Sequence, residues 1–150
     1  MWRKLIRFNA SDWLVLLQAV LLLPALNILL RRVRLERVQS RLAAWSQRVS
    51  RSKDHDADRA RAVSRTVDAL ARRTPFESNC LHRSLTTWFL LRRRRFDPTM
   101  RFGVKPDKPP TFHAWIEIED QVINDRPDIA SIYLPFPTAI QPQQIAEFDR

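Results

Sequence analysis

Residues 112–125 have the sequence FHAWIEIEDQVIND. Aromatic and β-branched residues recur through this stretch, which predicts two short strands, and Glu119-Asp120 is short enough to form the turn of an antiparallel hairpin. Such a hairpin sets His113, near the start of the first strand, beside Asp125, at the end of the second. The stretch therefore predicts an antiparallel sheet in which a histidine and a carboxylate meet.

Period-two alternation gives the first of these strands two different faces. One face carries His113, Trp115 and Glu117, and the other carries Ala114, Ile116 and Ile118. Asn124 should point to the sheet face opposite to Asp125. A further strand is predicted at residues 101–104, joined to the hairpin by a proline-rich loop at residues 105–110. The single glycine of the chain, Gly103, lies in that strand and indicates a close backbone approach.

Cys80 is the only cysteine of the chain, so an intramolecular disulfide is excluded and a reduced, cytoplasmic setting fits best. Thr74-Pro75 breaks any preceding helix, and Ser78 or Asn79 can cap the next one, which is predicted from Leu81 to about residue 95. Cys80 then lies in the first helical turn. There the unpaired backbone N–H groups and the helix dipole lower the pKa of a thiol.

Cys80, His113 and Asp125 together have the composition of a nucleophile, a base and an orienting carboxylate. Each residue taken alone has a structural interpretation: a small buried hydrophobic residue for the cysteine, a satisfied structural histidine, and a turn aspartate before Arg126-Pro127. Their combination favours a thiol protease or an acyltransferase.

Five separated blocks of this sequence resemble one known family, the leader peptidase of lasso-peptide biosynthesis, which is the protease half of the B protein. The blocks are NCLHRSL (79–85), LLRRR (90–94), FGV (102–104), HAWIE (113–117) and VIND (122–125). The resemblance implies an α+β fold similar to papain-like proteases and the transglutaminase core. It also implies that Cys80 is the nucleophile, His113 the general base and acid, and Asp125 the orienter, with no cofactor.

The same resemblance implies partners for the chain. The substrate would be a precursor peptide with its leader, a small winged-helix protein would bind that leader, and a separate ATP-dependent cyclase would close the ring. The chain departs from the family in its prolines at 106, 109 and 110, and in Arg95-Phe96, where the family more often has a glycine. The glutamine that completes the oxyanion hole in many papain-like proteases has no counterpart between Gln47 and Cys80, which leaves the Cys80 N–H as one donor.

Residues 1–73 are predicted to be helical and 74–150 to hold the protease core, within one domain of 150 residues. The apolar block from Trp13 to Leu30 is flanked by basic residues and contains Pro24, and it spans roughly 27 Å as a helix. We interpret it as a kinked helix buried across the core. Membrane contact and a groove for the leader or a partner are the alternatives, and a signal peptide is not indicated. Further helices are expected at residues 35–49, 57–73 and 140–148, the C-terminal segment being otherwise irregular.

The formal net charge of +10 indicates acidic partners, such as an acidic leader or anionic lipid. No nucleic-acid-binding signature is present, and one cysteine with three scattered histidines makes no metal site. Two other functions remain open. The same three residues could transfer an acyl group to an amine, or the chain could be a non-enzymatic membrane-associated adaptor in which Cys80 is inert.

Overall fold

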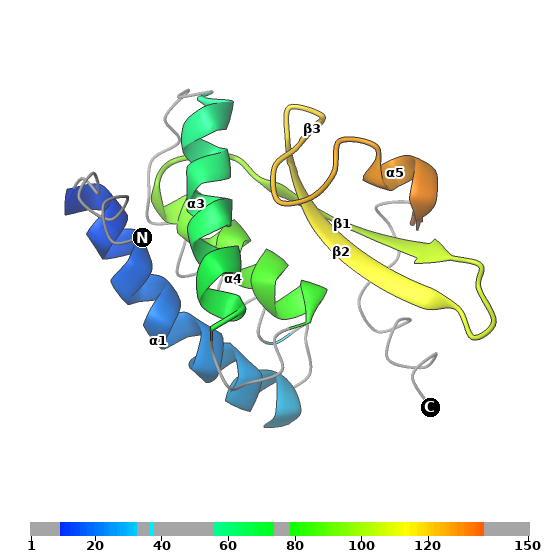
Figure 1. The fold of residues 1–150 in the computed structure, drawn as a ribbon, viewed down its shortest axis with the longest axis horizontal. Coiled ribbons are helices and arrows are strands. Elements are labelled where there is room, and N and C mark those ends of the chain that lie inside the picture. The colour runs from blue at the N-terminus through cyan, green and yellow to red at the C-terminus, as the bar shows by residue number, and fades with distance from the viewer. Residues whose placement is uncertain (1–9, 33–36, 38–55, 74–78, 137–150) are drawn as a thin grey trace.

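The computed structural model describes residues 10–32, 37, 56–73 and 79–136 of the chain. Three long helices lie together beside an antiparallel four-stranded sheet (Figure 1). The described helices are α1 (Ala10–Arg32), α3 (Ala57–Ala71), α4 (Cys80–Arg93) and the short α5 (Ile129–Ile132), and the strands are β1 (Thr99–Lys105), β2 (Thr111–Ile118), β3 (Gln121–Val122) and β4 (Leu134–Pro135). The predicted α+β class is confirmed.

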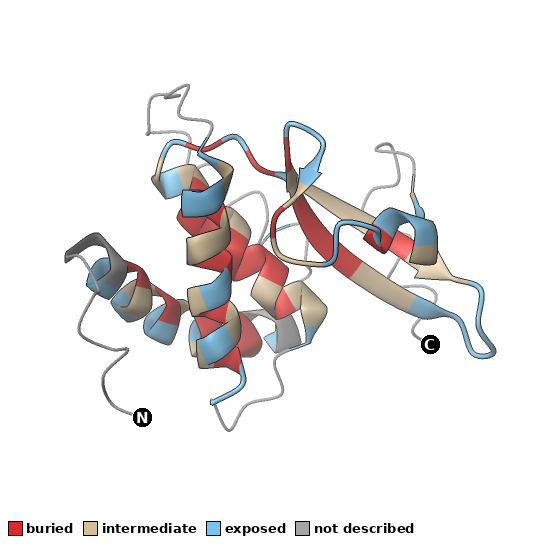
Figure 2. Ribbon diagram, turned by 45° about the horizontal axis from the view of Figure 1, so that its top comes forward, coloured by how far each residue is buried: buried red, intermediate tan, exposed pale blue. Residues whose placement is uncertain are grey.

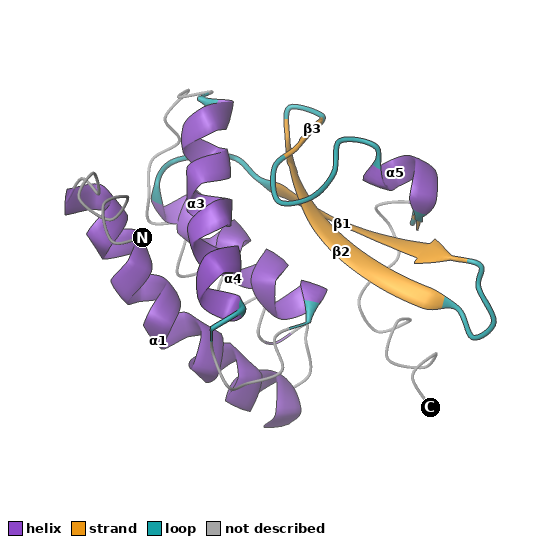
Figure 3. Ribbon diagram, in the orientation of Figure 1, coloured by secondary structure: helices purple, strands orange, loops and turns teal. Residues whose placement is uncertain are grey.

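The sheet has the order β3-β2-β1-β4, and its three sequence-adjacent strands form a meander (Figure 3). Glu119 and Asp120 form the turn between β2 and β3. Their φ angles are 49° and 61°, which is the left-handed conformation that suits a two-residue hairpin turn. The predicted hairpin is confirmed, but β3 is shorter than predicted. After Ile123 donates to the Ile116 carbonyl at 2.9 Å, the Asn124 side chain replaces the backbone as acceptor for the Ile116 N–H, at 2.7 Å.

Gly103 shows the close approach that its position in β1 predicted. It lies opposite His113 in the register of β1 and β2. A Cβ atom added there would lie 2.9 Å from two ring carbons of Trp115 and 3.0 Å from the backbone oxygen of Leu134. Trp115 is fully buried, so the indole cannot move aside. The pairing of β1 with both of its neighbouring strands therefore requires a glycine at position 103.

Helix α4 is the central helix, because it contacts α1, α3, β1 and β2. Its N-cap is Asn79, one of the two predicted caps, whose Oδ1 accepts from the His82 N–H at 3.1 Å. More than one face of α4 is buried, as the red segments of this helix in Figure 2 show. The buried polar residues Ser84, Thr86 and Thr87 accompany the apolar face, and the arginines gather in the last turn and just after it.

The C-terminus of α4 is a Schellman motif built without a glycine. Phe96 donates its N–H to the Leu91 carbonyl at 3.1 Å, and Arg95 donates to the Arg92 carbonyl at 3.0 Å. Arg95 has a φ of 69°, the left-handed conformation that costs a residue with a Cβ atom free energy. The departure from glycine noted in the sequence therefore falls at a position where glycine is the unstrained residue.

Arg95→Gly is expected to stabilise the protein. Relief of the left-handed strain should raise the free energy of unfolding by about 1 kcal/mol, which shifts Tm upward by about 2–4 °C for a chain of this size. Thermal and urea denaturation measure both quantities. Arg93→Gly is the matched control: Arg93 is an exposed residue in the last helical turn, and the same change there should destabilise by about 0.5–1 kcal/mol. A lower Tm for Arg95→Gly would contradict the strain argument.

Helix α1 uses one face to build the core and exposes the other. Val15, Ala19, Leu23 and Leu26 are buried against the other two long helices, and the helix continues through Pro24 from Ala10 to Arg32. The interpretation of this block as a buried helix is therefore correct for only one of its faces. No helix in the described part of the chain combines the length and the apolar character needed to cross a membrane.

The remaining helices and strands agree with the sequence predictions to different degrees. Helix α3 begins after its N-cap Asp56, where the predicted helix of residues 57–73 begins, and it buries Ala60, Val63 and Val67. Helix α5 and strand β4 were not predicted, because the proline-rich sequence after Asp125 shows no periodic pattern. The helices predicted at residues 35–49 and 140–148 lie outside the described residues.

Candidate functional site

The N-terminus of α4 brings the Cys80 thiol to the middle of the molecule, next to β2. Asn79 caps the helix, and Cys80 lies in its first turn, as the sequence predicted. Burial raises the pKa of the Cys80 thiol. The hydrogen bond with His113 and the backbone N–H groups of Ala114 and Leu81 lower the pKa. Their combined effect exceeds that of burial, so the pKa of the thiol lies below its ordinary value. The surroundings therefore favour the thiolate.

His113 lies between Cys80 and Asp125 and contacts both. Its Nε2–H donates to Oδ2 of Asp125 at 2.6 Å, which leaves Nδ1 for the hydrogen bond with the thiol. The hydrogen bonds with Asp125 and Cys80 raise the pKa of His113 to about 9, although burial acts in the opposite direction. An imidazolium beside a thiolate is the resting state that these shifts favour.

Asp125 is held by a second hydrogen bond on its other oxygen. Oδ1 accepts from the Arg126 N–H at 2.8 Å while Oδ2 accepts from His113. Burial raises the pKa of Asp125, but these two hydrogen bonds and the charges of His113 and Arg83 lower it below its ordinary range. The carboxylate is therefore ionised at neutral pH and fixed in one orientation toward the imidazole.

Two aromatic rings stack on the His113 imidazole and limit its rotation. Tyr133, which follows α5, stacks on the imidazole with ring centroids 4.8 Å apart, and Trp115 lies at 6.3 Å on the same face of β2. The Trp115 indole N–H donates to Glu117 at 2.8 Å, and Glu117 also forms an ion pair with Arg101 at 2.9 Å. Tyr133 was not predicted as a site residue, because the sequence around it does not indicate that the chain returns to His113.

A chain of three hydrogen bonds, one buried and two partly buried, joins α4 to β2 close to Cys80 and His113 in the sequence. The Ser84 hydroxyl, one turn after Cys80, donates to the Ala114 carbonyl at 2.8 Å. The Asn124 amide donates to the Ser84 oxygen at 2.9 Å and accepts the Ile116 N–H on its own oxygen. The Asn124 side chain thus bonds to α4 as well as to β2, and its bond to Ser84 was not predicted. The sequence contains no specific signal for it, because Ser84 is one of several polar residues in this helix, beside His82, Thr86 and Thr87.

Charged residues of α3 and α4 surround the Asp125 side of the site. Arg83 forms an ion pair with Asp68 at 3.6 Å, and its charge also favours the ionised form of Asp125. Burial raises the pKa of Asp68, and the negative charge of Asp125 adds to this effect while Arg83 and Arg72 oppose it. Neither Asp68 nor Arg83 was singled out in the sequence, because their proximity depends on how α3 packs against α4.

His82 is the second histidine in the described part of the chain, and it has other neighbours than His113 has. His82 is buried at the start of α4, and its Nδ1 lies 2.6 Å from Oδ1 of Asn79, so it belongs to the N-terminal cap of α4. His55 lies outside the described residues. Within residues 10–32, 56–73 and 79–136, no three side chains of the metal-binding types are grouped as a metal site requires.

The structure therefore brings Cys80, His113 and Asp125, which are far apart in sequence, into one connected line of hydrogen bonds. The order is thiol, imidazole, carboxylate. This arrangement can generate a thiolate nucleophile, hold a proton on the adjacent imidazole and keep that imidazole oriented. It is suited to attack on a carbonyl carbon, followed by protonation of the leaving group.

Comparison with known proteins gives one match. A family model described as the transglutaminase-like superfamily matches residues 21–136, which is most of the chain and includes all three residues of the site. No curated protein and no solved structure gives a significant match. The helix-plus-antiparallel-sheet arrangement agrees with the papain-like α+β core of that superfamily.

Proposed function

Because the chain belongs to the transglutaminase-like superfamily, whose fold is that of cysteine proteases and acyltransferases, we propose that it is a cysteine peptidase that removes the leader from a lasso-peptide precursor. The observation that carries the proposal is the hydrogen-bonded line of Cys80, His113 and Asp125. The five sequence blocks that resemble lasso leader peptidases supply the substrate class. The reduced thiol agrees with a reaction in the cytoplasm.

In the proposed reaction the Cys80 thiolate attacks the carbonyl carbon of the scissile peptide bond and forms a tetrahedral intermediate. The imidazolium of His113 then donates its Nδ1 proton to the leaving nitrogen, the C–N bond breaks, and the mature segment leaves as a free amine. The leader remains attached to Cys80 as a thioester. His113 next takes a proton from water, the resulting hydroxide attacks the thioester, and the leader departs with a new carboxylate.

The negative charge of the tetrahedral intermediate requires hydrogen-bond donors. The Cys80 backbone N–H lies at the N-terminus of α4, beside the positive end of the helix dipole, and we assign it as one donor. The other N–H groups of this turn have partners: Leu81 interacts with the thiol, His82 with the Asn79 side chain, and Arg83 with the Asn79 carbonyl.

The proposed peptidase works with a separate leader-binding protein. The lasso leader peptidases that the chain resembles act with a small winged-helix protein, and the helices and strands of the described residues do not form such a module. The net charge of +10 favours an acidic leader or an acidic partner surface. The ATP-dependent cyclase then receives the shortened peptide.

The test is mass spectrometry of a lasso precursor incubated in H₂¹⁸O with the protein, with and without the winged-helix protein. A peptidase produces one cleavage whose leader fragment carries ¹⁸O, and the rate rises when the winged-helix protein is added. Equal rates without that protein would remove the partner from the proposal. Addition of a primary amine separates the alternative activity, because an acyltransferase gives a leader fragment heavier by the amine and lacking ¹⁸O. An intact precursor in the presence of folded protein and cognate partner would refute the proposal.

The Ser84 hydroxyl is expected to position the reacting groups. Ser84→Ala breaks the bond from α4 to the Ala114 carbonyl and leaves the Asn124 amide without its acceptor, so Cys80 and His113 lose their fixed separation. We expect kcat to fall roughly 10- to 100-fold with KM little changed, and the free energy of unfolding to fall by about 1–3 kcal/mol. Steady-state cleavage kinetics and urea denaturation measure the two effects.

Thr86→Val is the matched control for Ser84→Ala. Thr86 is an equally buried hydroxyl of the same helix, but it donates at 2.8 Å to the His82 carbonyl within α4 and does not reach β2. Its replacement should lower stability and leave kcat close to the wild-type value. If both variants lower kcat equally, the effect of Ser84 is general destabilisation rather than positioning.

A further inference from the structure

The outward face of α1 is a continuous apolar ridge. Its members are large hydrophobic residues that are between 42% and 64% exposed, namely Trp13, Leu14, Leu17, Val20, Leu21 and Ile28. They recur at helical spacing, so they share one side of α1, opposite to the buried Val15, Ala19, Leu23 and Leu26. We refer to the six exposed residues as the α1 ridge. Scattered exposed hydrophobic residues are ordinary, but a stripe of six along one helix is not.

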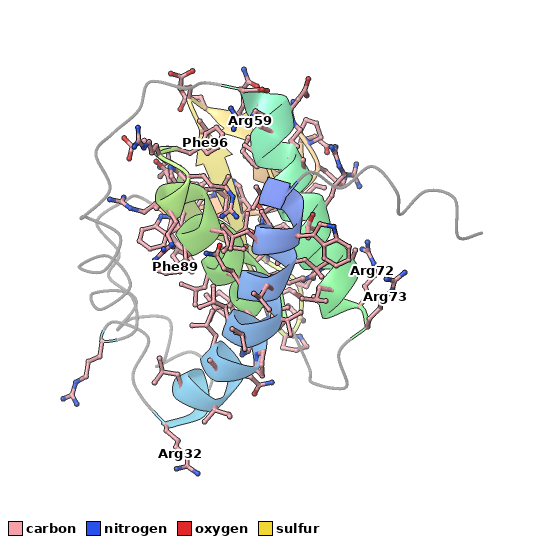
Figure 4. The ribbon with its side chains drawn as sticks, turned by 90° about the vertical axis from the view of Figure 1, so that its left-hand side faces the viewer. Arg32, Arg59, Arg72, Arg73, Phe89 and Phe96 are labelled. Atoms are coloured by element: carbon pink, nitrogen blue, oxygen red, sulfur yellow. The ribbon has the colours of Figure 1, made fainter. Side chains whose placement is uncertain are left out.

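The α1 ridge is convex and long. From Trp13 to Ile28 it extends about 22 Å along the helix axis. Helix α1 stands in front of α3 and α4 in the view of Figure 4, and in Figure 1 it is the helix farthest from the sheet. A convex apolar surface needs an occupant that can close around it. A bilayer interface does so, because its headgroups and acyl chains move aside around an inserted helix.

Basic residues border the α1 ridge. Arg32 is exposed at the C-terminal end of the helix, and Arg72 and Arg73 project from the end of α3 beside it (Figure 4). In the sequence alone, Arg3, Lys4 and Arg7 come before α1, and Arg34 comes after it. The only acidic residue within α1 is Asp12. An apolar stripe with a cationic border matches the apolar interior and anionic headgroups of a negatively charged bilayer.

We propose that the α1 ridge binds the surface of an anionic lipid bilayer, with α1 lying in the plane of the headgroups. The buried face of α1 stays packed on α3 and α4, so binding requires no unfolding of the core. Helices α3 and α4 lie between α1 and the sheet, so the Cys80 and His113 side of the molecule remains in water (Figure 1). This proposal is independent of the peptidase activity. It assigns the protein a location at the membrane surface.

The test is flotation of the full-length protein with vesicles of phosphatidylcholine alone and of phosphatidylcholine with phosphatidylglycerol. We expect binding to the anionic vesicles that weakens as salt is added, and little binding to the neutral ones. The double variant Leu17→Ser/Leu21→Ser should weaken binding at least tenfold. Leu134→Ser removes an equally exposed leucine from β4, away from the ridge, and should bind as wild type does. A second double variant, Arg72→Gln/Arg73→Gln, should weaken binding to the anionic vesicles only.

Quenching of Trp13 by brominated lipids locates the contact. The wild-type signal minus that of Trp13→Phe should show quenching in anionic vesicles. Three outcomes would overturn the proposal: no binding to anionic vesicles at low salt, unchanged binding of Leu17→Ser/Leu21→Ser, or self-association in lipid-free sedimentation that this variant abolishes while vesicles bind neither protein. The last outcome would assign the ridge to a second copy of the chain. Absence of vesicle binding without self-association would assign the α1 ridge to another segment of the chain, such as residues 35–49, where the sequence predicts a helix.

Discussion

Cys80→Ala is expected to lower kcat/KM for precursor cleavage by roughly 10⁴-fold or more. The thiol is the only atom in the Cys80, His113 and Asp125 line that can form the acyl-enzyme, and neither His113 nor Asp125 can replace it from its position behind the thiol. The assay is cleavage of the precursor in the presence of the leader-binding protein. Retained cleavage by Cys80→Ala would remove the cysteine from the mechanism and leave the adaptor hypothesis as the better reading.

The single cysteine makes the control for this prediction unambiguous. Iodoacetamide should label wild-type protein once, at Cys80, and abolish its activity, while Cys80→Ala takes up no label. Because the pKa of Cys80 in the folded protein lies below its ordinary value, alkylation should be fast at neutral pH. In urea the same thiol should require the higher pH of an ordinary cysteine. Identical pH profiles for folded and unfolded protein would show that the site does not activate the thiol.

Asp125→Asn is expected to lower kcat by roughly 10²- to 10⁴-fold and to change the pH profile. The asparagine keeps the shape of the side chain but loses the charge that holds the imidazolium and fixes its orientation. In the wild type the pKa of His113 is about 9, so activity should decline as the pH rises through that value and the imidazolium loses its proton. Without the carboxylate the pKa of His113 falls, so the alkaline limb of the profile should move toward neutral pH.

Asp128→Asn is the matched control for Asp125→Asn. It is the same chemical change three residues later in the chain, on an exposed carboxylate whose partner is Arg126. Its kcat and its alkaline limb should equal those of wild type. An Asp125→Asn variant with the wild-type alkaline limb would show that Asp125 does not set the pKa of His113.

The same two shifted groups make stability depend on pH. The pKa of His113 is raised in the folded state, so its contribution to the free energy of unfolding is complete below about 6.5 and is lost as the pH rises through about 9. The pKa of Asp125 is lowered, so its contribution is present above 3.8 and is lost as the pH falls through the depressed value. The stability difference between wild type and Asp125→Asn in urea should therefore be largest between about pH 4 and 6.5, and it should shrink as the pH rises from about 6.5 through about 9.

The parts of the site that were predictable from sequence are those with a local physical signature. A capping asparagine, Asn79, sets the start of α4 at Cys80, because the unpaired N–H groups of a first helical turn need acceptors. Alternation in residues 112–118 and a two-residue turn set the hairpin, and with it the side-by-side positions of His113 and Asp125. Gly103 likewise predicted a close approach, but it did not identify Trp115 as the neighbour.

The contacts that hold these pieces together could not be predicted in the same way. Ser84, Asn124 and Tyr133 act across elements, and their side chains have no local pattern that names a distant partner. The same limit applied to α1. Its apolar sequence predicted burial, but a helix packed on one side of a bundle has only half its surface covered, and the sequence shows no difference between the two faces because both are apolar.

For this protein, the sequence by itself determined the helix that begins at Cys80, the hairpin that pairs His113 with Asp125, and the candidate chemistry of those three residues, because capping, alternation and turn length act between near neighbours. Only the tertiary structure decided that α4 lies against β2 so that the thiol reaches the imidazole, which hydroxyl and amide hold them there, and which face of α1 meets solvent. Those outcomes depend on how separate elements pack, and packing is decided by the combined shape and burial of surfaces that no single segment contains.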